Sequence, residues 1–139
     1  MKQLYTILFL LTAAALPSCK KYIQQQEKNA VLQIMTTGVW YVQQYQQNDS
    51  DITASFNGYI FKFNANGTVV GTQGGNSVNG TWSANISALT ISSDFPTAGD
   101  PLKELNETWK ITDSGNDYVV ANSKDDSSNA INNLRLQKQ

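Results

Sequence analysis

Aromatic and other side chains alternate from Tyr59 to Phe63, so that a ring recurs at every second position. This is the period of a β-strand with one buried face. Asn66-Gly67 ends this run and Gly74-Gly75 ends the next, and both dipeptides favour tight turns because their residues tolerate positive φ angles. The pattern predicts three antiparallel strands joined by two hairpins, the first with a type I′ turn.

The same alternation between short apolar runs and turn residues continues through the rest of the chain. The predicted strands are 38–47, 58–64, 67–73, 77–84, 88–93, 107–113, 117–122 and 131–137. One of the two longer connections, 94–106, contains a predicted helical turn that begins at Pro101. Regular short strands with no long helix between them predict an all-β fold, an antiparallel up-and-down barrel of eight strands, closed or partly open.

Strand parity divides the side chains between the interior of this barrel and its surface. The predicted inward residues are Trp40, Val42, Phe61, Phe63, Val78, Trp82, Leu89, Ile91, Trp109, Ile111, Leu134 and Leu136. Tyr41 and Tyr45 fall on the opposite face of the first strand, where they form a candidate contact surface or an ordinary solvent-facing strand, in which tyrosine is favoured anyway. Gly80 interrupts a strand, and we expect a tryptophan to pack over it.

Residues 1–18 have the pattern of a signal peptide. Lys2 precedes an apolar run, 4–16, that is too short to span a bilayer but typical of a signal sequence. The run ends in Leu16-Pro17-Ser18-Cys19, which resembles the lipobox of bacterial lipoproteins. The resemblance implies cleavage between Ser18 and Cys19 and lipid attachment to Cys19, which is the only cysteine. The alternative, a buried core cysteine, does not explain its place at the end of the apolar run.

A polar segment separates this cysteine from the predicted barrel. Residues 19–36 are rich in Gln and Lys, with apolar residues at helix-like spacings, and predict a lipidated tether with a short helix outside the barrel domain, 37–139. The residue after Cys19 is lysine and not the aspartate that retains some lipoproteins in the inner membrane. The expected location is therefore the outer membrane, facing the periplasm, with exposure at the cell surface as the alternative.

Charge and composition argue against several function classes. The net charge is −1, with 10 basic and 11 acidic residues, so the chain has no excess of positive charge for nucleic-acid binding. Histidine is absent, and the single cysteine is assigned to the lipid, which leaves no Ser-His or Cys-His pair and none of the usual zinc ligands. Glu104 and Glu107, on one face of the short predicted helix, are read as solvated. We therefore predict no enzyme, no cofactor and no metal site.

Several short motifs together resemble the lipocalin-like lipoproteins of Gram-negative bacteria. They are Gly38-Val39-Trp40, which matches the Gly-x-Trp of lipocalins and other calycins, Phe61-Lys62-Phe63 before Asn66-Gly67-Thr68, Gly80-Thr81-Trp82, and 104–109. The resemblance implies that a basic residue of the last strand packs on Trp40 beside Gly38 and closes the barrel. Arg135 is the expected residue, although its parity points outward.

The lipocalin resemblance implies a membrane-anchored, monomeric barrel that binds a small apolar or amphipathic ligand. The candidate pocket residues are Trp40, Phe61, Phe63, Trp82 and Trp109. The alternative is a structural or interaction lipoprotein that presents its surface to a protein partner or an envelope glycan. Side chains of this size in a barrel of eight strands should leave at most a shallow pocket. The volume of the interior therefore distinguishes the two functions.

Overall fold

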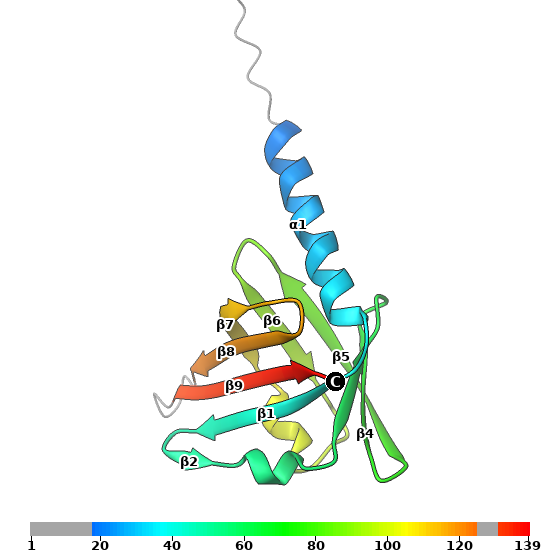
Figure 1. Ribbon diagram of the computed structural model, residues 1–139, viewed down its shortest axis with the longest axis vertical. Coiled ribbons are helices and arrows are strands. Elements are labelled where there is room, and N and C mark those ends of the chain that lie inside the picture. The colour runs from blue at the N-terminus through cyan, green and yellow to red at the C-terminus, as the bar shows by residue number, and fades with distance from the viewer. Residues whose placement is uncertain (1–17, 125–130) are drawn as a thin grey trace, which may run out of the picture.

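The computed structural model describes residues 18–124 and 131–139 and forms a barrel with one long helix at its end (Figure 1). Its strands are β1 (Trp40–Gln47), β2 (Ser50–Asp51), β3 (Ile60–Phe63), β4 (Thr68–Gln73), β5 (Asn76–Asn85), β6 (Thr90–Asp94), β7 (Thr108–Ser114), β8 (Tyr118–Lys124) and β9 (Ile131–Lys138). Helix α1 (Ser18–Thr36) precedes them, and the 3₁₀ helices η1 (Thr53–Phe56) and η2 (Leu102–Leu105) lie in the two longer connections.

All pairings between strands are antiparallel, and each strand from β3 to β9 pairs with the next. The barrel closes where β1 pairs with β9 along its length and, through Trp40 and Phe61, with β3. The predicted all-β, up-and-down barrel of eight strands is confirmed, and the short β2 is an additional strand that folds back on the end of β1. The predicted helical turn after Pro101 is η2.

The two predicted hairpin turns differ from each other in backbone conformation. Gly74 and Gly75 both have positive φ angles, as expected for a two-residue turn. The predicted type I′ turn at Asn66-Gly67 is wrong, because of these two residues only Gly67 has a positive φ. Asn66 acts instead through its side chain, whose oxygen accepts hydrogen bonds from the backbone and the hydroxyl of Thr68.

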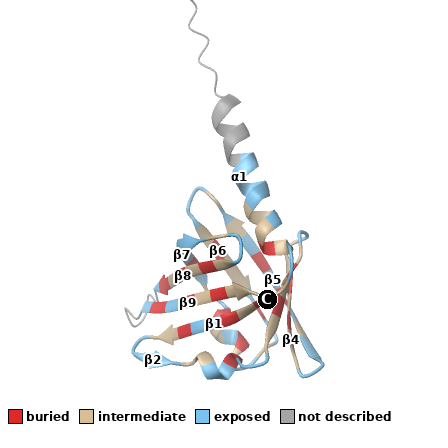
Figure 2. Ribbon diagram, viewed as in Figure 1, coloured by how far each residue is buried: buried red, intermediate tan, exposed pale blue. Residues whose placement is uncertain are grey.

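Buried residues alternate with more exposed ones along the strands (Figure 2), and the buried side chains form the core of the barrel. Of the predicted inward residues, Trp40, Val42, Phe61, Phe63, Trp82, Ile91, Trp109, Leu134 and Leu136 are buried, and Val78 and Ile111 are partly buried against the core. Leu89 is instead 52% exposed, because it lies with positive φ in the turn before β6 and not in the strand.

The assignment of Tyr45 to the outer surface is also wrong, since its side chain is completely buried. The pairing of β1 with β9 shifts register between Val42 and Gln44. A β-bulge of this kind adds one residue to a strand and reverses the alternation beyond it. Tyr45 therefore points inward, while Tyr41, before the bulge, is half-buried. The two tyrosines do not form the predicted surface stripe.

Gly80 lies beneath Phe95, and the expectation of a tryptophan over this glycine is wrong. A Cβ atom at position 80 would be 2.5 Å from the carbonyl oxygen of Asp94 and 2.7 Å from Cδ1 of Phe95. Such distances are far below van der Waals contact. Gly80 thus lets the chain that leaves β6 cross β5 closely enough to bury Phe95, whose side chain is 1% exposed.

We expect Gly80→Ala to lower the free energy of unfolding by about 1–3 kcal/mol, because the neighbouring backbone has to move. Urea unfolding followed by circular dichroism measures the change. Gly99→Ala is the matched control: a Cβ there meets nothing within 4 Å, so its effect should stay within about 0.5 kcal/mol. Equal effects of the two substitutions would contradict this account of Gly80.

Helix α1 is joined to the barrel at its C-terminal end, which corrects the domain boundary placed at residue 37. Met35 is 1% exposed and belongs to the core. Its carbonyl oxygen accepts a hydrogen bond of 2.9 Å from Nε1 of Trp40, and Nζ of Lys62 donates to the carbonyl oxygen of Thr36 at 2.8 Å. These donors satisfy carbonyls that the end of a helix leaves unpaired, so the direction of α1 is fixed by the barrel.

A basic residue does close the barrel beneath Trp40, but it is Lys138 and not Arg135. Nζ of Lys138 lies 4.9 Å from the centre of the Trp40 ring, and a Cβ at Gly38 would be 3.3 Å from Cδ of Lys138. Arg135 lies on the outer side, where it stacks on Tyr118 and donates to Gln43. The parity of the last strand therefore gave the correct side for Arg135, and the expectation from the resemblance did not.

Candidate functional site at the barrel end opposite the helix

The barrel interior contains a cavity of only about 40 Å³. Its lining is almost entirely apolar and consists of Phe61, Phe63, Val69, Ile91, Ser93, Phe95, Leu105, Trp109, Val119, Ala121, Leu134 and Leu136. An engineered cavity that takes up benzene measures about 150 Å³, so this space is too small for an acyl chain. The interior is filled by side chains, in agreement with the expectation from the size of its aromatic residues.

Three of the five candidate pocket residues, Phe61, Phe63 and Trp109, line this cavity. The other two lie nearer α1. Trp40 packs at the base, and Trp82 makes an edge-on contact with Phe63, with 5.3 Å between ring centres. Trp82 also borders a separate groove of about 270 Å³ between the barrel and Leu32 of the helix. The five aromatics are thus distributed along the barrel and do not form one pocket.

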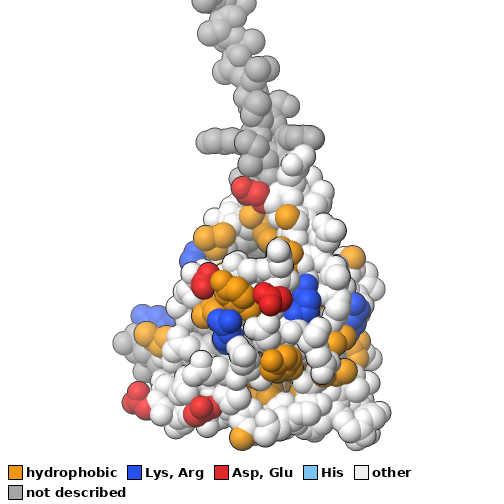
Figure 3. All heavy atoms as spheres, in the orientation of Figure 1, with side chains coloured by type: hydrophobic (Ala, Val, Ile, Leu, Met, Phe, Trp, Pro, Cys, Tyr) orange, Lys and Arg blue, Asp and Glu red, His pale blue; other side chains and the backbone are white. Residues whose placement is uncertain are grey.

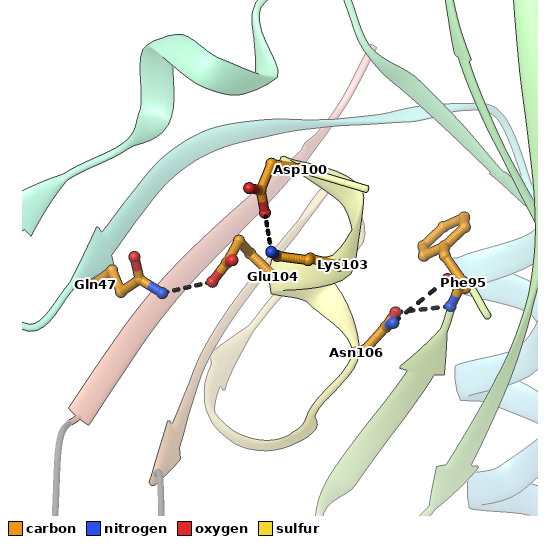
Figure 4. Close-up of polar contacts among 6 residues, drawn as sticks. All are labelled: Gln47, Phe95, Asp100, Lys103, Glu104 and Asn106. Carbon is orange, nitrogen blue, oxygen red and sulfur yellow. Dashed lines mark hydrogen bonds and ion pairs between the residues drawn. The ribbon is translucent and has the colours of Figure 1, made fainter. Parts of the chain in front are cut away.

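The opposite end of the barrel is closed by η2. Leu102 and Leu105 are buried against the core, and the hydroxyl of Tyr45 donates a hydrogen bond of 2.7 Å to the carbonyl oxygen of Glu104. Asn106 supports the loop from the other side, where its side-chain oxygen accepts from the backbone N–H of Phe95 at 2.7 Å (Figure 4). Sequence parity missed Leu102, Leu105 and Asn106 because they lie in a connection and not in a strand.

A polar groove of about 410 Å³ lies between η1 and η2 at this end. It is lined by Gln47, Ile52, Ser55, Asp100, Pro101 and Glu104. Nε2 of Gln47 donates to the carboxylate of Glu104, and Nζ of Lys103 pairs with Asp100 at 3.0 Å (Figure 4). Asp100 of the groove is therefore already paired with a cation, Lys103.

The carboxylates of Glu104 and Glu107 act on the buried phenol of Tyr45 at this end of the barrel. Burial, followed by the charges of Glu104 and Glu107, raises the pKa of Tyr45 well above its usual range. The two glutamates do not share a helix face as expected, because η2 ends at Leu105. Both nevertheless lie close enough to the phenol of Tyr45 for their charges to raise its pKa.

Two polar side chains lie buried on β8 and β9, the strands that continue the sheet from Gln47. Ser123 is 3% exposed and Asn132 is 5% exposed, and neither Ser123 Oγ nor Asn132 Oδ1 has a hydrogen-bond partner among the described residues. Asn132 is the Cα partner of Gln47 on one side and of Ser123 on the other. β1, β9 and β8 thus carry Gln47, Asn132 and Ser123 in one row. The inward parity of Leu134 also applies to Asn132, so the sequence held a signal for this row.

The predicted lipid site lies at the other extreme of the structure. Ser18 and Cys19 begin α1, but the description of side chains starts at residue 25, and residues 1–17 lie outside the described part. The signal peptide and lipid attachment stay predictions. No helix in the described part of the chain is both long and apolar enough to cross a membrane.

Within 18–124 and 131–139, no group of three or more His, Cys, Asp or Glu side chains is placed to hold a metal ion. The groove presents the side-chain amide of Gln47 and the carboxylates of Asp100 and Glu104. What this arrangement offers chemically is recognition through hydrogen bonds and charge.

Comparison with solved structures identifies a crystal structure of the same fold. It is a DUF4847 family protein from Bacteroides vulgatus, with a TM-score of 0.56 and 14% sequence identity. The match covers 78% of this chain and 99% of the other. At this identity the likeness shows the fold alone. No protein-family model and no curated protein matches the chain.

Proposed function

We propose that this protein is a lipid-anchored envelope lipoprotein whose barrel presents its surface to a partner. The observation that carries the proposal is the filled interior, because a cavity of about 40 Å³ leaves no room for a lipocalin-type ligand. What is left for recognition is the outside of the barrel and its end. The resemblance to lipocalin-like lipoproteins supports the anchor and the barrel together.

The arrangement of α1 supports a defined orientation on the membrane. The helix has 19 residues and begins beside Cys19, so it is about 28 Å long. Its other end is fixed to the barrel by Trp40 and Lys62. A lipid on Cys19 would therefore hold η1 and η2 on the side of the barrel that faces away from the membrane (Figure 1). The groove between them is the surface most accessible to a partner.

The outer membrane, with the barrel in the periplasm, is the location that we propose. The support is the lipobox-like sequence before Cys19 and the absence of an aspartate directly after it. On the face of the barrel seen in Figure 3, acidic, basic and hydrophobic side chains are interspersed. Such a surface favours a protein or a glycan as partner over a polyanion.

Binding of a small apolar molecule is the second candidate function. It is favoured by the almost wholly apolar lining of the interior cavity. The volume restricts such a ligand to a few heavy atoms. Saturable, one-to-one binding of a long-chain fatty acid, followed by tryptophan fluorescence, would instead mean that the interior opens beyond this volume, and would favour a ligand-binding function over the first.

Cys19→Ala is expected to abolish membrane attachment without changing the stability of the barrel. Cys19 is separated from the first barrel contact of α1 by several turns, and lipid chains at the N-terminus give essentially permanent anchoring. Expression in a Gram-negative host, followed by membrane fractionation and thermal melting, measures both effects. Ser83→Ala, on the surface of β5, is a control that should stay in the membrane fraction. A Cys19→Ala protein that stays there would contradict the lipid anchor.

Photocrosslinking in the native envelope tests the interaction itself. A crosslinking residue in place of Ser55 or Pro101 lies in the groove between η1 and η2. One in place of Lys28 lies on α1, in the groove between the helix and the barrel. The proposal expects a discrete crosslinked partner from Ser55 and Pro101 and none from Lys28. The same partner at all three positions, or no partner at any of them, would contradict the proposal that the groove between η1 and η2 faces a partner.

A further inference from the structure

The first half of β5 is an open edge of the barrel sheet. β5 pairs with β4 from Asn76 to Thr81, but β6 joins it only from Thr81 onward, because the chain leaves β6 after Asp94, the Cα partner of Thr81. Within the described residues, this half of β5 therefore has one neighbouring strand, β4. The β4–β5 hairpin reaches the end of the barrel that lies away from α1 (Figure 1). The open edge, 76–80, is thus at the end that carries η1 and η2.

The backbone groups of Ser77 and Asn79 point out of this edge. In an antiparallel pair, successive residues turn their N–H and C=O groups alternately to the two sides of the strand. The N–H of Trp82 donates to the carbonyl oxygen of Gly67, just before β4, and the register from 76 to 81 has no shift, so the even-numbered residues of β5 face β4. Ser77 and Asn79 face the other side. No hydrogen bond with another described residue uses their N–H or C=O groups.

This edge lacks the features by which proteins block the pairing of exposed strands. Such edges are usually protected by charged side chains, proline, a bulge or very short length. Residues 64–93 contain no Lys, Arg, Asp, Glu or proline. β2, by contrast, is two residues long and carries Asp51, and β7, where it extends past its pairing with β6, carries Asp113 beside a register shift. The β5 edge is therefore suited to accept another strand.

A second copy of this chain does not fit on the edge. The first half of β5 lies near η2, since Gly71 is the Cα partner of Val78 and a Cβ at Gly71 would be 3.5 Å from Cδ2 of Leu102. Its second half borders the groove beside Leu32 of α1. β5 thus runs from the η2 end toward the helix. Antiparallel pairing of two β5 edges would point the two α1 helices in opposite directions, which two copies anchored in one membrane cannot adopt.

We propose that the β5 edge binds an extended segment of a partner protein, which adds a strand beside Ser77 and Asn79. The residue of this segment opposite Val78 points to the inner side, where Val78 is partly buried against the core, and should be apolar. The residues on either side of it share the exposed face of Ser77 and Asn79 and should be polar. They should also be uncharged, because residues 64–93 offer no opposite charge. The inference rests on the proposed function, whose partner it identifies as a protein held through its backbone.

Hydrogen exchange of the purified ¹⁵N-labelled full chain in detergent micelles tests the edge without a partner. The amides of Ser77 and Asn79 should exchange at least about tenfold faster than those of Val78 and Gly80, because an amide without a hydrogen bond exchanges without opening of the sheet. Val78 and Gly80 are the matched controls, since their amides face β4 in the same strand. Equal protection at all four positions would overturn the open edge and the strand addition with it.

Photocrosslinking in the native envelope tests the added strand. p-Benzoylphenylalanine in place of Ser77 should crosslink one protein, and mass spectrometry should place the crosslink in a segment with the polar–apolar–polar pattern. Asn79→Pro in the same chain should lower the yield at least about tenfold, because it removes an outward N–H that no strand of the barrel uses. Asn79→Ala keeps this N–H and should crosslink as the unaltered chain does.

The outcomes separate strand addition from the proposed function. Equal yields from Asn79→Pro and Asn79→Ala, or crosslinking of Ser77 to a glycan or to a second copy of this chain, would overturn strand addition. A partner still crosslinked from Ser55 and Pro101 would then leave the proposed function standing, whereas no partner at any position overturns both. Asn79→Pro should melt within about 5 °C of the unaltered chain. If it melts earlier, Asn79→Lys, which adds a charge to the edge and keeps the backbone, should give the same loss of yield.

Discussion

Trp40→Ala is expected to lower the free energy of unfolding by about 3–5 kcal/mol, the usual cost of truncating a buried tryptophan. Trp40 is completely buried, and it is the Cα partner of Lys138 in β9 as well as of Phe61 in β3. Its indole nitrogen also donates a hydrogen bond to the carbonyl oxygen of Met35 at the end of α1. The substitution therefore opens the core at the closure of the barrel and releases the helix at the same time. Urea unfolding followed by tryptophan fluorescence and circular dichroism measures the loss.

Three further variants separate these contributions. Trp40→Phe keeps an aromatic ring but removes the indole donor, so it should cost less than Trp40→Ala and should loosen α1 specifically, which hydrogen exchange detects. Lys138→Ala should cost about 0.5–1 kcal/mol through loss of the cation–π contact. Arg135→Ala, on the outer side, serves as the matched control and should leave α1 unchanged. A loss below 1 kcal/mol in Trp40→Ala would contradict a closing role for this residue.

Much of the barrel could be predicted from the sequence because its strands have one buried face and one solvent-exposed face. Alternation alone located every long strand to within a few residues, from Phe61 and Phe63 in β3 to Leu134 and Leu136 in β9. This worked because the burial of a side chain in such a strand depends on its own position and not on distant contacts. The up-and-down order of the strands followed from their short connections, whereas the closure of the barrel, through the pairing of β1 with β9, was left open by the sequence.

The errors occurred where the backbone leaves regular geometry. The bulge after Val42 adds one residue to β1, and from there parity assigns Tyr45 to the wrong face. Phe95 lies outside the strands, so its packing over Gly80 depends on the path of a loop that alternation does not describe. Met35 lies in the last turns of α1, which pack on the core. The sequence did not predict this because most of the helix is polar.

The candidate site was harder to predict than the fold because its members have no shared sequence pattern. Asn132 and Ser123 lie on the correct parity for the interior, but a search for apolar residues passes over them. The register of β1, β9 and β8 places them in one row with Gln47, and the position of η2 brings Glu104 to Gln47. Register and loop position are long-range properties, set by the packing of the complete barrel.

Tyr45→Ala is expected to lower the free energy of unfolding by about 3–5 kcal/mol, comparable to the loss of a core tryptophan. The Tyr45 ring stacks on Phe56 and meets Trp109 edge-on, at centre distances of 5.5 and 5.6 Å. Its hydroxyl donates a hydrogen bond to the carbonyl oxygen of Glu104. The substitution therefore removes one contact each with η1, β7 and η2. Urea unfolding measures the loss of stability, and hydrogen exchange should show η2 opening first.

Tyr41→Ala is the control that distinguishes the structure from strand parity alone. Parity without the bulge places Tyr41 and Tyr45 on one solvent-facing stripe, so it expects two small and similar effects, within about 0.5 kcal/mol. The structure buries Tyr45 and leaves Tyr41 half-buried, so it expects a large effect at position 45 and a clearly smaller one at position 41. Tyr45→Phe should cost about 0.5–1.5 kcal/mol, since the ring contacts stay and only the hydrogen bond to Glu104 is lost. Equal, small losses at both tyrosines would mean that β1 has no bulge and that η2 is held by other contacts.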